Sequence, residues 1–180
     1  MQPITRYRKD NRAKRVRESH KVVLMNNTEI ERKFLVVGDA FLTQAVRHYD
    51  MEQGYLCKAP ERTVRVRIRD TRAFLTIKST QNSTTLAHFE WEKEIDVQDA
   101  RQLLALCLPT PIHKTRYIVP ATDAEGQPTG LKWEIDVFHG TREGLRIAEI
   151  ELPSEDTVFN KPEFVGTEVT DNPAYYNANL

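Results

Sequence analysis

Two glutamates and a lysine alternate along a short segment near the start of the chain, in the order Glu29, Glu31 and Lys33. Side chains of a β-strand point to alternate faces, so these three would share one face, with neighbours roughly 7 Å apart. At an effective dielectric constant of about 20, two unit charges at that distance repel by about 2 kcal/mol. A metal ion or basic partners would relieve this repulsion. Alternatively, a single row of charged residues of this kind can simply be the solvent-exposed face of a strand.

Charged residues alternate with apolar ones in the same way along several later segments, and each segment carries mainly one sign of charge. An ordinary one-sided sheet would mix lysine, threonine, serine and glutamine on its solvated face. Sorting by sign instead predicts separate acidic and basic strands. The basic positions are Arg65, Arg67, Arg69, Lys78, Lys114 and Arg116, and the acidic positions are Glu90, Glu92, Glu94, Glu134, Asp136, Glu149 and Glu151.

A closed antiparallel sheet would place these charged faces around its interior and leave the apolar faces to pack outward against helices. The predicted fold is therefore α+β but mainly β. It is an eight-stranded antiparallel closed tunnel barrel, with helices packed outside and a short C-terminal helix near one mouth. One wall of the tunnel would bind a divalent metal and the other a polyanion, which suits a triphosphate with its magnesium.

Turn and capping residues set the boundaries of the elements that position these charges. Helices are predicted over 39–48, 96–108 and 172–179, because aspartate caps open the first two and a proline suits the first turn of the third. Pro109 and Pro111 would end the second helix. Strands are predicted over 28–37, 49–58, 62–70, 73–80, 86–96, 112–120, 130–139 and 145–152.

Several of these segments, taken in order, resemble those of the CYTH, or triphosphate tunnel metalloenzyme, superfamily. The matching pieces include Glu29-x-Glu31-x-Lys33, Gln53-Gly54-Tyr55-Leu56, Val64-Arg65-Val66-Arg67, Leu75-Thr76-Ile77-Lys78, Lys114-Thr115-Arg116-Tyr117 and Ala148-Glu149-Ile150-Glu151-Leu152. The resemblance covers about residues 28–180 and is nearest to the small bacterial inorganic triphosphatases. It implies an eight-stranded tunnel that acts on triphosphate-bearing substrates with Mg²⁺ or Mn²⁺.

Residue chemistry assigns roles to most of these charged positions. Carboxylate oxygens suit hard Mg²⁺, whereas guanidinium forks and ammonium groups suit phosphate oxygens. The predicted metal set is Glu29, Glu31, Asp136, Glu149 and Glu151, and the predicted phosphate set is Lys33, Arg65, Arg67, Lys78, Lys114 and Arg116. Arg69 shares their face, but the family motif stops at Arg67. The candidates to orient or deprotonate the attacking water are Glu90, Glu92 and Tyr55, the last by its match to the family's tyrosine.

Composition bounds the setting in which the protein works. Two cysteines, Cys57 and Cys107, form no Cys-x-x-Cys pair, and no stretch of about 18 apolar residues exists. A cytoplasmic protein without membrane partners is expected. Residues 1–25 hold eight basic and two acidic residues, so 1–27 is predicted to be a disordered extension and 28–180 the tunnel domain. A nucleic-acid-binding or anion-binding arm and a true start at Met25 are the alternatives.

These observations predict an enzyme that hydrolyses inorganic triphosphate to pyrophosphate and phosphate, with a small-molecule triphosphate as its partner. Within the same superfamily the alternatives are a thiamine, nucleoside or RNA triphosphatase and a class IV adenylate cyclase. A non-catalytic module that binds polyphosphate or RNA is the alternative from another class, since it needs the arginines but not the glutamates.

Overall fold

One antiparallel sheet dominates the computed structural model, which describes residues 28–59, 62–79, 87–108 and 110–180, with only the backbone described at 28, 29 and 87–89. Its strands run in the order β5-β4-β3-β2-β6-β7-β8-β1-β9. They are β1 Thr28–Val36, β2 Arg47–Ala59, β3 Arg62–Arg69, β4 Arg72–Ser79, β5 Ala87–Ile95, β6 Ile112–Thr122, β7 Pro128–Phe138, β8 Arg146–Leu152 and β9 Val165–Glu168.

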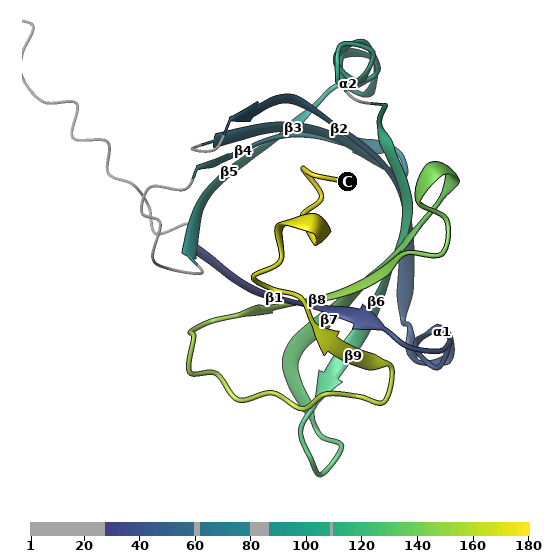
Figure 1. Cartoon of the computed structure of the whole chain (residues 1–180), viewed down its shortest axis with the longest axis vertical. Coiled ribbons are helices and arrows are strands. Elements are labelled where there is room, and N and C mark those ends of the chain that lie inside the picture. Colours follow the sequence, from purple (N-terminus) through teal and green to yellow (C-terminus); the bar gives the residue numbers. More distant parts are fainter. Residues whose placement is uncertain (1–27, 60–61, 80–86, 109) are drawn as a thin grey trace, which may run out of the picture.

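The sheet bends so far that strands from its two sides also meet. β5 pairs with β1 through Thr28–Phe89, Glu29–His88 and Ile30–Ala87, in addition to its pairing with β4. In Figure 1 the strands surround a central space. The part of the chain that follows β9, called here the C-terminal segment, enters that space. The prediction of a mainly β, antiparallel architecture with few helices is confirmed.

Among the described residues the sheet has nine strands instead of the eight predicted, because the prediction has no counterpart for β9. β9 pairs with β1 through Phe34–Glu168 and Val36–Val165. Its four residues are too short to show an alternating pattern of apolar side chains. The loop that precedes β9 returns along the outside of the sheet, where Phe164 accepts a backbone hydrogen bond from Val37 at 2.9 Å.

The helices α1 and α2 lie outside the curved sheet (Figure 1). The predicted helix 96–108 is observed as α2, Val97–Leu104, and the Asp96 side chain caps it by accepting from the Gln98 backbone N–H at 2.7 Å. The predicted helix 39–48 is wrong beyond one turn, since α1 spans only Phe41–Gln44 and Ala45 is already extended. From Arg47 the backbone pairs with Ile118 of β6, so strand pairing replaces the helix.

The predicted C-terminal helix 172–179 is also wrong in length. A 3-10 turn, η3 (Pro173–Tyr175), is capped by the Asn172 side chain, which accepts from the Ala174 backbone N–H at 3.1 Å. The predicted N-terminal extension, 1–27, lies outside the described residues. No helix in the described part of the chain is both long enough and apolar enough to cross a membrane.

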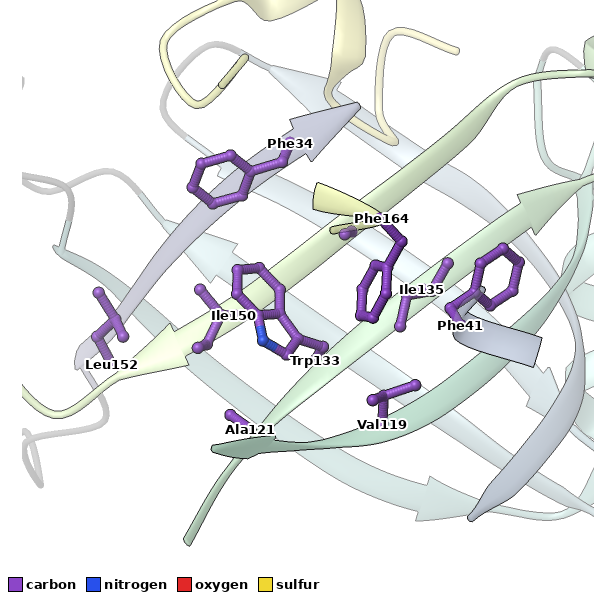
Figure 2. Packing of buried hydrophobic residues seen from close by; sticks show 10 residues of the cluster. Phe34, Phe41, Val119, Ala121, Trp133, Ile135, Ile150, Leu152 and Phe164 are labelled. Carbon is purple, nitrogen blue, oxygen red and sulfur yellow. The ribbon is translucent and has the colours of Figure 1, made fainter. Parts of the chain in front are cut away.

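Apolar side chains cover the outer face of the sheet in two places. Under α2, Val66 and Ile68 of β3 pack against Ala100 and Leu104. On the far side, Trp133 is fully buried and meets Phe34 edge to face at 5.6 Å, with Phe164 beyond it (Figure 2). Because side chains alternate along each strand, burying these faces outside turns the charged faces inward.

Candidate active site

The inward faces of the strands surround a cavity of about 790 Å³. Acidic and basic side chains supply most of its polar lining, which includes two predicted metal ligands, Glu31 and Glu149, and two predicted phosphate ligands, Arg65 and Arg67. The strand register explains this arrangement, because residues directly opposite each other in neighbouring strands share a face. Opposite charges therefore meet across strand pairs on the inner wall.

Lys33 joins the first acidic pair. Its Nζ lies 2.5 Å from Glu149 Oε1 and 2.9 Å from Glu31 Oε1, and Lys33 stands opposite Glu149 in the β1–β8 register. Burial by itself would lower the pKa of Lys33, but the two carboxylates outweigh it and raise the pKa above its ordinary value. Lys33 is thus held as an ammonium ion between two carboxylates.

Arg116 connects three carboxylates at the centre of the inner wall. Its Nε and Nη2 donate to the two Asp136 oxygens at 2.6 Å each, Nη2 also donates to Glu149 Oε2 at 2.9 Å, and Nη1 donates to Glu134. Burial raises the pKa of Asp136, and the charges of Arg116 and Lys114 reverse this and lower it. The fork of Arg116 fixes the orientation of these carboxylates, which a point charge could not do.

Lys114 lies behind this network. Its Nζ donates to Asp136 Oδ2 at 2.5 Å and to Asn177 Oδ1 of the C-terminal segment at 3.1 Å. Burial lowers the pKa of Lys114 to about 8; repulsion by Arg116 adds to this decrease, and attraction by Asp136 opposes it. Lys114 is only 2% exposed and does not line the cavity.

The opposite wall is formed by β3, β4 and β5. Arg67 Nη2 donates to both Glu92 oxygens, at 2.8 and 3.1 Å, and Arg65 Nη2 lies 3.5 Å from Glu90. Lys78 Nζ lies 2.6 Å from Glu90. Burial and repulsion by Arg65 lower the pKa of Arg67 to about 10, which still leaves it charged at neutral pH. Arg65, Arg67 and Lys78 are therefore each held by a carboxylate of β5.

Two donors of this wall lack acceptors. Within the described part of the chain, the Nε atoms of Arg65 and Arg67 are buried and have no hydrogen-bond partner. An unsatisfied buried donor costs about 1–3 kcal/mol, and more when it is charged. A phosphate oxygen that accepted hydrogen bonds from these Nε atoms would remove that cost. Uncompensated costs of this kind are typical of ligand-binding sites.

Tyr55 lines the cavity together with residues of the C-terminal segment. Its ring belongs to an apolar cluster with Ile112 and Phe138, against which Tyr175 and Leu180 pack. Gln53 Nε2 donates to the Tyr55 hydroxyl at 3.4 Å. Burial raises the pKa of Tyr55 despite the opposing effect of Arg65. The phenol stays protonated at neutral pH, so it can donate a hydrogen bond but is a poor base.

The structure brings most of the predicted site residues to one cavity. The exceptions are Lys114 and Asp136, which lie behind its surface, and Glu29, whose side chain is outside the described residues. Arg69 lines the cavity, with its guanidinium 4.9 Å from the rings of both Tyr49 and Phe74. The predicted residues on the lining are Glu31, Lys33, Tyr55, Arg65, Arg67, Lys78, Glu90, Glu92, Arg116, Glu149 and Glu151.

The metal set is only partly assembled. In the portions of the chain that the structure describes, no three acidic, histidine or cysteine side chains form a group that could hold a metal. Glu31 and Glu149 accept from Lys33 instead, and Asp136 is fully buried with both oxygens on Arg116 and Lys114. Asp136 thus has the surroundings of an internal counterion, not of a solvent-facing ligand.

Sequence reasoning did not assign roles to four residues that complete the site. Thr76 and Thr170 are buried hydroxyls, Glu134 is the third carboxylate on Arg116, and Asn177 is the acceptor for Lys114. Thr170 accepts from the Lys33 backbone N–H at 3.1 Å and donates to Glu168 at 2.7 Å. Glu134 and Thr76 occupy inward positions of charged strands, a signal that could have identified them.

Known proteins match both the sequence and the fold. The CYTH domain model matches residues 27–177. A protein from Acetivibrio thermocellus named inorganic triphosphatase is 44% identical over 153 residues, covering 84% of this chain and 92% of that protein. A second protein of that name, from Nitrosomonas europaea, is 35% identical over 157 residues, covering 85% of this chain and 96% of that protein.

Solved structures agree with these sequence matches. The crystal structure described as inorganic triphosphatase NE1496 has a TM-score of 0.58 and 33% identity, and the match covers 84% of this chain and 93% of that one. A conserved hypothetical protein from Pyrococcus furiosus, with a TM-score of 0.52 and 22% identity, shares the fold.

Proposed function

Because this chain belongs to the CYTH domain family, we propose that it hydrolyses inorganic triphosphate to pyrophosphate and phosphate. The observation that carries this conclusion is the 44% identity, over most of both chains, to a protein named inorganic triphosphatase. A cavity lined by arginines and lysines beside glutamates supports it, since such a wall suits a small polyanion. We also propose that the β1–β5 pairing closes the sheet into the predicted tunnel.

In this proposal the β3–β4 wall binds the phosphates. Arg65 and Arg67 offer guanidinium forks, and Lys78 and Lys33 add point charges on either side. Binding places negative phosphate oxygens where Glu90 and Glu92 now lie against these cations. Phosphoryl transfer depends mainly on positioning and on neutralising the charge of the transferred group, which these four cations can supply.

We propose Mg²⁺ or Mn²⁺ as the cofactor, held by Glu29, Glu31, Glu149 and Glu151. The donor chemistry fits, because Glu31 and Glu151 stand opposite each other in the β1–β8 register and line the cavity with Glu149. A divalent ion bound there would neutralise charge on the phosphate oxygens. Asp136 is proposed as the residue that positions Arg116 and Lys114, and not as a metal ligand.

The residue that orients the attacking water is proposed from the charge balance of the β5 wall. A triphosphate that takes over Arg67 would displace Glu92, whose carboxylate currently accepts from it at 2.8 Å. A carboxylate released next to the bound phosphate can accept a proton from water. Tyr55, held in its phenol form by burial, would donate a hydrogen bond instead.

A substrate panel tests this proposal. Phosphate release is measured from tripolyphosphate, thiamine triphosphate and ATP, with Mg²⁺, Mn²⁺ or a chelator, in the wild type and the E31A variant. We expect metal-dependent phosphate release from tripolyphosphate that E31A loses while it still binds the anion. Formation of cyclic AMP without phosphate release from tripolyphosphate would instead identify a cyclase. Tight tripolyphosphate binding without turnover under any metal would identify a binding module.

A further inference from the structure

We propose that Thr76 is a positioning residue for the phosphate-binding arginines, an inference that rests on the proposed function. Thr76 lies on β4 between the basic strand β3 and the acidic strand β5. In the strand registers it stands directly opposite Arg65 on one side and Glu92 on the other. It is 1% exposed and does not line the cavity, so it acts on substrate only through its neighbours.

The Thr76 hydroxyl makes one hydrogen bond to each of these neighbours. Its Oγ1 lies 2.7 Å from Glu92 Oε2 and 3.3 Å from Arg65 Nη2. An ionised carboxylate only accepts hydrogen bonds, and a guanidinium only donates them. The single hydroxyl proton must therefore point to Glu92, and the oxygen must accept from Arg65. This polarity is fixed by the two neighbours, so the hydroxyl cannot rotate without losing a bond.

Glu92 extends this connection to the second arginine. The same Oε2 that accepts from Thr76 also accepts from Arg67 Nη2 at 2.8 Å, and it lies 3.6 Å from Arg65 Nη2. Thr76 therefore holds Arg65 directly, and it would keep one hydrogen bond to Glu92 after triphosphate displaced that carboxylate from Arg67, which lowers the cost of the displacement. With these Nη2 groups engaged, the two buried Nε donors that lack partners are held at fixed positions beside the cavity.

Valine tests the hydroxyl with little change in shape, since T76V keeps the branched side chain and removes both hydrogen bonds. Loss of hydrogen bonds to charged groups typically weakens an interaction about tenfold to a hundredfold. We expect the Kd of the wild-type protein for tripolyphosphate, measured by calorimetry without metal, to rise by about that factor in T76V. T76S keeps the hydroxyl and should stay within about threefold of the wild type.

A double-mutant cycle with R65A separates positioning from general packing. If Thr76 acts through Arg65 and the Glu92 it shares, then T76V should change the Kd of the R65A variant much less than that of the wild type. T115V is the matched control, because Thr115 also makes two side-chain hydrogen bonds, to Asp50 at 3.1 Å and to His139 at 2.9 Å, away from the cavity. It should bind tripolyphosphate as the wild type does.

The outcomes distinguish this inference from the proposed function. Two results would overturn the role of Thr76 and leave the proposed function standing. One is normal turnover by the wild type together with an unchanged Kd in T76V. The other is that T76V changes the Kd equally with and without R65A. Wild-type binding without turnover would overturn the proposed function, and the Kd values would still decide the role of Thr76. A wild type that does not bind tripolyphosphate would overturn both. If T76V does not fold, T76C replaces it, and wild-type affinity in T76C would equally refute the proposal.

Discussion

Arg116 is the residue whose removal should disturb the site most, because three carboxylates depend on one guanidinium. It donates to both oxygens of Asp136, to Glu149 and to Glu134, while its own side chain is 12% exposed. Each carboxylate has a second cation: Lys114 for Asp136, Lys33 for Glu149 and Lys132 for Glu134. The R116M variant therefore keeps every carboxylate partly paired but leaves the cluster with excess negative charge.

The expected magnitude follows from this burial. Removing one partner of a buried, hydrogen-bonded ion pair typically costs about 3–5 kcal/mol. For a protein of this size, each kcal/mol lowers Tm by about 2–4 °C, so R116M should melt about 6–20 °C below the wild type. R116K keeps the charge but loses the fork, and it should lose about half as much free energy of unfolding.

Urea unfolding at pH 7 measures these differences, and R72M supplies the control. Arg72 also pairs with a carboxylate, Glu94 at 2.6 Å, but both side chains are about half exposed. Exposed pairs contribute about 0–1 kcal/mol, so R72M should unfold nearly as the wild type does. Comparison of the two variants isolates the effect of burial, because both remove one arginine that faces a carboxylate.

The loss of unfolding free energy in R116M should also depend on pH. Arg116 lowers the pKa values of Asp136 and Glu134 below their ordinary values of 3.8 and 4.5, and Lys33 together with Arg116 lowers the pKa of Glu149. Groups with lowered folded-state pKa values stabilise the protein above those ordinary values and lose that contribution as the pH falls through the folded-state values. The difference in unfolding free energy between the wild type and R116M should therefore decrease at acidic pH. A difference below about 1 kcal/mol at pH 7, or one that is the same at pH 3 as at pH 7, would refute this account.

Three other substitutions test separate parts of the structure. E31Q should lower metal-dependent turnover about 100-fold or more while preserving tripolyphosphate binding, as expected when charge stabilisation is lost; a metal titration of activity checks this. Y55F should lower kcat only about fivefold, the value of one neutral hydrogen bond, and a loss above about 1,000-fold would mark Tyr55 as more than a donor. G54A should lower the free energy of unfolding by about 1–3 kcal/mol in a urea titration, since the added methyl would lie 2.7 Å from Cys107 Cβ.

The alternation of side chains made the charged wall predictable. Glu31, Lys33, Arg65 and Arg67 face one cavity because period-two patterning places them on one side of their strands. Helix length was less predictable, as residues 45–48 show. There β-strand pairing with β6 overrides local helix propensity, and that pairing connects residues about 70 positions apart.

The pairing of individual charges could not be read from the sequence. Asp136 and Glu149 carry the same alternation on adjacent acidic strands, yet Asp136 is enclosed by Lys114 and Arg116 while Glu149 lines the cavity. The Lys114 Nζ that pairs with Asp136 also donates to Asn177 Oδ1 of the C-terminal segment. Contacts of that kind join residues more than 60 positions apart, and neither a motif nor a period encodes them.

If the function is as proposed, the pairing of charges within the cavity predicts that metal and triphosphate bind cooperatively. Lys33, Arg67 and Arg116 each hold a carboxylate, so a triphosphate bound by them would compete with these internal anions. Every carboxylate that it displaces is left in a partly buried position, where an unpaired charge is costly. A divalent cation bound by the displaced glutamates would remove that cost and thereby strengthen triphosphate binding. Because coupling between two ligands is reciprocal, triphosphate would strengthen metal binding by the same factor. The internal ion pairs would therefore weaken the binding of either ligand alone and favour the binding of both together.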